Sequence, residues 1–131
     1  MQDINVIWLK KDLRIRDHAS FAAAEDSDLP YLIVHIMEPD ALDAPDVSLR
    51  HLQFIYHSLN NLEKNLNDKG QFVLRCYGSR TEVFLYLSTL YKVQQVFSYQ
   101  ESGCKRTWDK DKAVAAFFKE LGIQWKEFAR D

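Results

Sequence analysis

A dense run of charged side chains follows the first apolar segment of the chain with almost no spacer. Residues 4–9 have the composition of a buried strand, and residues 10–17 then bring four cations and two carboxylates. Cations of this kind bind anionic groups, and carboxylates accept hydrogen bonds from N–H donors. The run therefore predicts a ligand site. Its alternatives are a solvated loop or a structural ion pair between Asp12 and Arg14.

The rest of the chain alternates apolar runs with helical patterns. Five runs are rich in β-branched and aromatic residues and mostly lack polar alternation, as expected for strands covered on both faces. These runs are residues 4–9, 31–37, 71–77, 95–99 and 123–128, and the last alternates enough to be an edge strand. The expected helices are one capped by Asp17, a long one from Ser48 to Gly70, and two over residues 81–91 and 107–121.

Repeated strand–helix units of this length require parallel strands joined by right-handed crossovers. The chain is therefore predicted to form an α/β, Rossmann-like, doubly wound sheet of five parallel strands with helices on both faces. The expected strand order is 3-2-1-4-5. The third helix is expected to turn Val83, Phe84, Leu87 and Leu90 inward, and the fourth Val114, Phe117, Phe118 and Leu121.

In such a sheet a crevice opens at the carboxyl ends of strands 1 and 4, where the strand order reverses. Three segments should meet there, namely residues 10–16, 37–39 and 100–106, with Arg50 close by and Trp8 near the floor. Several cations, a few carboxylates and an indole suit a planar polyanionic or conjugated ligand better than a neutral sugar.

Familiar catalytic and phosphate-binding patterns do not occur. No G-x-G-x-x-G follows the first strand, and the chain contains no P-loop sequence. Ser102 lacks the glycine pattern of a nucleophile elbow. The scattered histidines favour structural roles, and no cluster has metal-ligand spacing. These histidines are His18, His35, His51 and His57. We therefore expect no catalytic residue and no metal site in this chain.

Bulk composition narrows the class further. A length of 131 residues fits one domain, and the net charge of −2 argues against a free-standing nucleic-acid binder. Cys76 lies in an apolar run and is predicted to be a buried small hydrophobe, and Cys104 has no metal-like spacing to it. No segment approaches the ~20 apolar residues that span a bilayer. We expect a cytoplasmic protein without a membrane segment.

Four motifs, in order along the chain, resemble those of DNA photolyases and cryptochromes. Residues 7–18, Ile-Trp-Leu-Lys-Lys-Asp-Leu-Arg-Ile-Arg-Asp-His, resemble the family's opening strand and its basic, Asp-Leu-Arg continuation. Met37-Glu38-Pro39 resembles the acidic-Pro step after strand 2, and residues 50–55 resemble the start of the long helix. Residues 100–103 and 107–111 resemble the loop and helix start after strand 4.

The chain also departs from the family pattern. Lys10 and Lys11 stand where arginines are commoner, His18 replaces the usual Asn, and Cys104 interrupts the second loop. Lysines keep the charge of arginine but lose its bidentate geometry, so planar contacts there are not carried over.

The resemblance implies that residues 1–131 are a single domain, the N-terminal, antenna-binding α/β domain of a deoxyribodipyrimidine photolyase-like protein. In that family FAD and the substrate cleft belong to a C-terminal helical domain, which is absent here and would be the main partner. The full-length protein alone is then expected to bind damaged DNA, and no catalysis is expected from this fragment. A homodimer of the fragment is a further expectation. The alternatives are a cryptochrome blue-light photoreceptor, a stand-alone nucleotide-binding module and a docking domain without ligand.

The family's antenna chromophore is a deazaflavin, a methenyltetrahydrofolate or FMN, and such a role needs rigid binding but no nucleophile. An indole and the edge loops would wall the ring, cations would neutralise anionic substituents, and a carboxylate would accept ring N–H bonds. The residues expected to bind it are Trp8, Lys11, Arg14, Met37, Glu38, Arg50 and Glu101.

Overall fold

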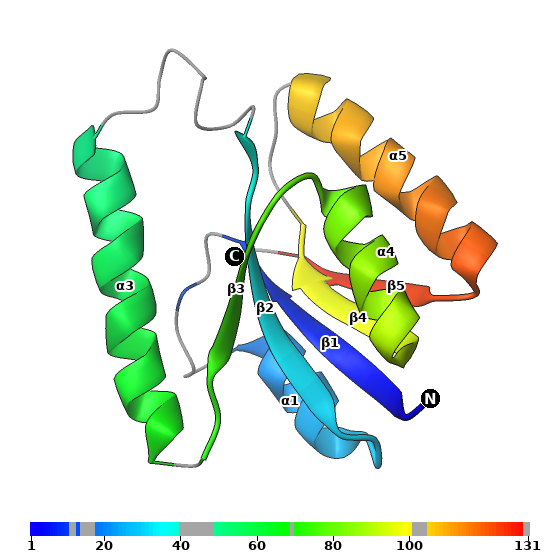
Figure 1. The fold of residues 1–131 in the computed structure, drawn as a ribbon, viewed down its shortest axis with the longest axis horizontal. Helices are drawn as coiled ribbons and strands as arrows, with labels where there is room; N and C mark the ends of the chain where they lie inside the picture. The colour runs from blue at the N-terminus through cyan, green and yellow to red at the C-terminus, as the bar shows by residue number, and fades with distance from the viewer. Residues whose placement is uncertain (11–12, 14–17, 40–48, 69, 101–104, 130–131) are drawn as a thin grey trace.

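The computed structural model has a parallel sheet with helices packed on each face (Figure 1). It describes residues 1–10, 13, 18–39, 49–68, 70–100 and 105–129. The strands are β1 (Asp3–Leu9), β2 (Tyr31–Met37), β3 (Val73–Tyr77), β4 (Lys92–Tyr99) and β5 (Gln124–Phe128). The helices are α1 (Ala19–Asp26), α3 (Leu49–Asn67), α4 (Arg80–Leu90) and α5 (Lys105–Leu121).

The strand order is β3-β2-β1-β4-β5, and every neighbouring pair is parallel. This confirms the predicted fold class and strand order. The carboxyl ends of all five strands therefore lie at one edge of the sheet, and the order reverses beside β1.

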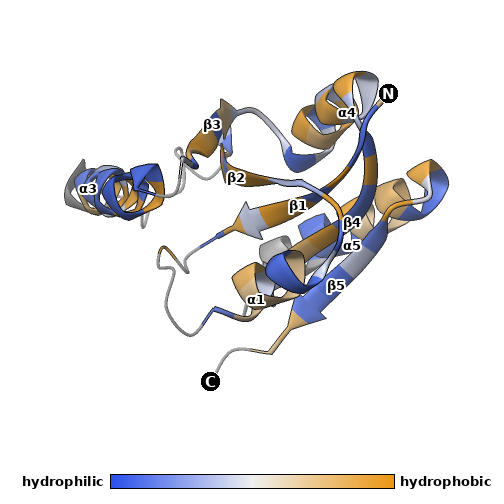
Figure 2. Ribbon diagram, turned by 90° about the horizontal axis from the view of Figure 1, so that it is seen from below, coloured by the Kyte–Doolittle hydropathy of each residue, from blue (hydrophilic) through white to orange (hydrophobic). Residues whose placement is uncertain are grey.

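The central strand β1 is buried on both of its faces. Val6 and Trp8 pack with α4 and α5, whereas Ile7 and Leu9 pack with α1 and α3. Figure 2 shows the resulting apolar colour along β1 and β2 between the helices. Two-sided burial explains why the first apolar run in the sequence is continuous rather than alternating.

The fourth strand is longer than predicted, since β4 begins at Lys92 rather than at Gln95. Its register with β1 shifts between Ile4 and Asn5, where Val93 and Gln95 are the successive partners. Gln94, which lies between these partners, is an extra residue in β4, as in a β-bulge. It interrupts the apolar pattern from which the start of this strand would have been predicted.

The start of α1 also differs from the prediction. The N-cap is His18 rather than Asp17, which lies outside the described residues. The Nδ1 atom of His18 accepts a hydrogen bond from the backbone N–H of Phe21 at 3.3 Å. The Tyr99 hydroxyl accepts another from the N–H of Ala19 at 2.7 Å, so β4 supplies part of the cap. The Nδ1 atom of His18 thus accepts the capping hydrogen bond that the carboxylate of Asp17 was expected to accept.

Helix α4 is apolar on its outer side as well as on its inner side. Val83, Phe84 and Leu87 are buried as predicted, but Leu90 is 49% exposed because the helix ends there. Leu121, at the end of α5, is likewise 40% exposed. The α4 outer face, defined as Leu85, Tyr86 and Leu90, is a surface that an ordinary solvent-facing helix would make polar.

Cys76 lies on β3, which is an edge strand of the sheet among the described residues, and it is therefore only half-buried, so the prediction of a buried cysteine is wrong. Burial still raises the pKa of its thiol. Within the described part of the chain, no helix combines the length and apolar character needed to cross a membrane.

Tyr31 anchors the opposite, amino-terminal edge of the sheet. Its hydroxyl donates to Glu25 Oε1 at 2.6 Å and accepts from Gln71 Nε2 at 2.7 Å. Burial, with a smaller effect of the Glu25 hydrogen bond, raises the pKa of Tyr31 to about 12.

We expect this shift to appear in the pH dependence of stability. The unfolded tyrosine ionises near its ordinary pKa of 10.0 and the folded one near 12, so its contribution is complete below pH 10 and is lost between these values. Urea unfolding from pH 8 to 12 should show a steeper decline for the wild type than for Tyr31→Phe. Parallel curves for the two proteins would contradict the assignment.

Candidate functional site

The guanidinium of Arg80 is the centre of an ion cluster at the carboxyl edge of the sheet. Arg80 opens α4 and is 7% exposed. Its Nε donates to Glu38 Oε1 at 2.9 Å, and its Nη1 donates to the carboxylate of Asp111. A buried cation is tolerated only when it is paired in this way. The pairing joins the end of β2 to the start of α4 and to α5.

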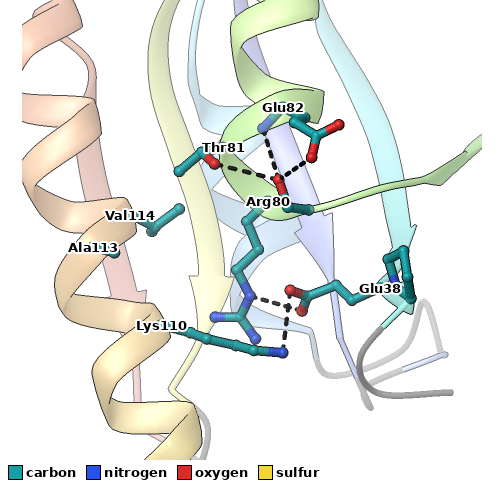
Figure 3. Close-up of a pocket in the computed structure, with 9 residues that line it drawn as sticks. Glu38, Arg80, Thr81, Glu82, Lys110, Ala113 and Val114 are labelled. Carbon is teal, nitrogen blue, oxygen red and sulfur yellow. Dashed lines mark hydrogen bonds and ion pairs between the residues drawn. The ribbon is translucent and has the colours of Figure 1, made fainter. Parts of the chain in front are cut away.

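Glu38 lies between two cations. It follows β2 directly, and its second oxygen, Oε2, is 3.4 Å from Lys110 Nζ on α5. Figure 3 shows the Glu38 carboxylate between the side chains of Arg80 and Lys110. Both carboxylate oxygens are therefore oriented by positive charge, and the side chain is held in one direction.

Trp8 forms the floor beneath these charges. Its ring centroid is 5.0 Å from the guanidinium carbon of Arg80 and 4.3 Å from Lys10 Nζ. Lys10 Nζ is also 4.0 Å from an oxygen of Asp111. The indole stacks on Trp125 of β5 with centroids 5.8 Å apart. Cations over an aromatic face are attracted by its quadrupole, so the floor is favourable for the cluster above it.

A cavity of about 330 Å³ opens beside the cluster, between the first turn of α4 and α5. We call it the α4–α5 cleft. Ser79 caps α4 at its rim: its Oγ accepts from the Glu82 N–H at 3.2 Å and donates to Glu82 Oε1 at 3.0 Å. The cleft is lined by Glu38, Pro39, Ser79, Arg80, Thr81, Glu82, Lys110, Ala113 and Val114 (Figure 3).

Comparison with known proteins identifies the family of this chain. The family model described as DNA photolyase matches residues 5–131. The chain belongs to the DNA photolyase family. The strand order and helices described above are those of the family's N-terminal α/β domain, so the resemblance found in the sequence is confirmed.

Relatives of this family member are remote in sequence. A cryptochrome DASH of Solanum lycopersicum is 25% identical over 124 residues, 90% of this chain and 21% of the tomato protein. A deoxyribodipyrimidine photo-lyase of Salmonella typhimurium is 34% identical over 67 residues, 50% of this chain and 14% of that protein. The archaeal photolyase of Sulfolobus tokodaii superposes with a TM-score of 0.85 at 22% identity, over 97% of this chain and 29% of its own. The chain thus spans about a fifth of the tomato protein.

The structure places the residues predicted for the site on different sides of the sheet. Trp8 is 2% exposed on the α4 and α5 side, and Glu38 lines the cleft on that same side. Met37 ends β2, directly before Glu38. Arg50 lies in α3, whose core packs on the opposite face, and its side chain lies outside the described part. Lys11, Arg14 and Glu101 also lie outside the described residues.

Three members of the cluster were missed in the sequence. Lys110 and Asp111 belong to a segment that the family resemblance named, but no role was attached to them. Arg80 belongs to no motif, and the signal that could have found it is its place shortly after the third strand, behind Gly78, which has a positive φ of 146°. A charged residue that follows a parallel strand lies at the same edge of the sheet as the carboxyl end of β1.

Removing the central guanidinium should be costly. We expect Arg80→Met to lower the free energy of unfolding by about 3–5 kcal/mol, because it leaves the Glu38 and Asp111 carboxylates without their main partner. Arg80→Lys should lower the free energy of unfolding by less than Arg80→Met does, because lysine keeps the positive charge. It should still be less stable than the wild type, because lysine lacks the planar guanidinium that donates to both carboxylates. Urea unfolding at pH 7 measures these differences.

The exposed pair of Arg75 with Glu63 provides a matched control. Its atoms are 3.0 Å apart with both side chains about 30% exposed, so Arg75→Met should cost only about 0–1 kcal/mol. Equal losses for Arg80→Met and Arg75→Met would show that the cluster is not the constraint we describe.

Proposed function

We propose that this chain is the antenna-chromophore-binding and docking domain of a deoxyribodipyrimidine photolyase-like protein, whose full-length form repairs DNA with light in the cytoplasm. The observation that carries the proposal is a ligand-sized cleft beside a rigid ion cluster, at the edge where α/β sheets bind ligands, in a chain of the DNA photolyase family. The Sulfolobus tokodaii photolyase, which shares this fold, is described with two FAD molecules, which are said to imply a novel light-harvesting cofactor.

An antenna domain needs a rigid binding site for its chromophore and needs no acid–base catalyst. A bound ring must keep one orientation, and water must be excluded from around it. Arg80 and Glu38 are held by several partners each; Arg80 lies in the first turn of α4, and Glu38 directly follows β2. Catalysis on damaged DNA would belong to the C-terminal FAD-binding helical domain, with which this domain would pack.

A cryptochrome is the second candidate, because the tomato relative is a cryptochrome DASH that matches over 90% of this chain. A blue-light photoreceptor would use the same domain to hold the same class of chromophore. The two proposals make one shared prediction for this chain, which is that it binds a light-absorbing ligand.

Reconstitution tests that shared prediction. The chain is mixed in turn with a deazaflavin, methenyltetrahydrofolate and FMN, passed through a gel-filtration column, and read by absorbance. We expect one of the three to co-elute with the protein at about one per chain. Glu38→Gln should weaken retention of the ligand, because the variant lacks the negative charge that pairs with Arg80 and Lys110 and keeps their side chains in place. Retention of none would favour a docking domain without ligand.

The α4 outer face is the surface we propose for docking of the helical domain. Leu85, Tyr86 and Leu90 are about half exposed or more, and apolar area of this kind on one helix marks an interaction site. The chain covers only 29% of the Sulfolobus tokodaii photolyase, so most of that relative has no counterpart here.

For residues 1–131 studied on their own, we expect a homodimer that forms through the α4 outer face. Sedimentation velocity should show concentration-dependent dimers that Leu85→Glu abolishes, because a buried, unpaired carboxylate is unfavourable. Ala115→Glu, at an exposed position of α5, should leave the dimer intact. A chain that stays monomeric at every concentration and binds no hydrophobic dye would contradict this surface.

A further inference from the structure

We draw no further inference here: the strongest candidate, the aromatic surface of α3 and β3 where Phe54, Tyr56 and Tyr77 are each more than half exposed, carries no proposal because nothing in the structure shows what covers it.

Discussion

A buried guanidinium must be neutralised, and the carboxyl edge of this protein is organised around that requirement. Arg80 reaches Glu38 on one side and Asp111 on the other, and it lies over the ring of Trp8. Trp8, Arg80 and Asp111 belong to β1, α4 and α5, and Glu38 directly follows β2, so each ion pair also fixes the position of one element relative to another. The α4–α5 cleft lies directly beside these contacts, and Arg80, Glu38 and Lys110 line it.

The cluster is better explained by geometry than by stability. A buried ion pair often contributes less to folding than well-packed apolar side chains of the same volume, because both charges lose their hydration. The two faces of the sheet already provide large apolar cores, with Phe84 and Phe118 on one side and Leu62 and Leu66 on the other. The ion pairs instead fix the orientation of the Glu38 side chain. Its carboxylate cannot rotate without losing Arg80 at one oxygen and Lys110 at the other.

The fold was predictable from the sequence because it depends on patterns that repeat. The apolar runs of β1 and β2, separated by amphipathic helices, determine parallel pairing, and this sets the strand order. Predictions failed where one tertiary contact replaced a local rule. The bulge in β4 hid its first residues, and the Tyr99 hydroxyl and His18 ring capped α1 in place of Asp17. Glu38 was found because it directly follows a recognisable strand, whereas Arg80 was not, since its partners are 31 and 42 residues away.

The position of Trp8 shows how a correct local interpretation can lead to a different site. The indole was expected to wall a ligand, yet it is buried, and the charged groups of Arg80 and Lys10 cover its ring. The indole therefore acts on the cluster through those cations, whose positions it favours by cation–π attraction. The stacked Trp125 extends the same aromatic floor from β1 to the edge strand β5. For the chromophore-binding role that we propose, such a floor would hold the cations beside the cleft in one orientation.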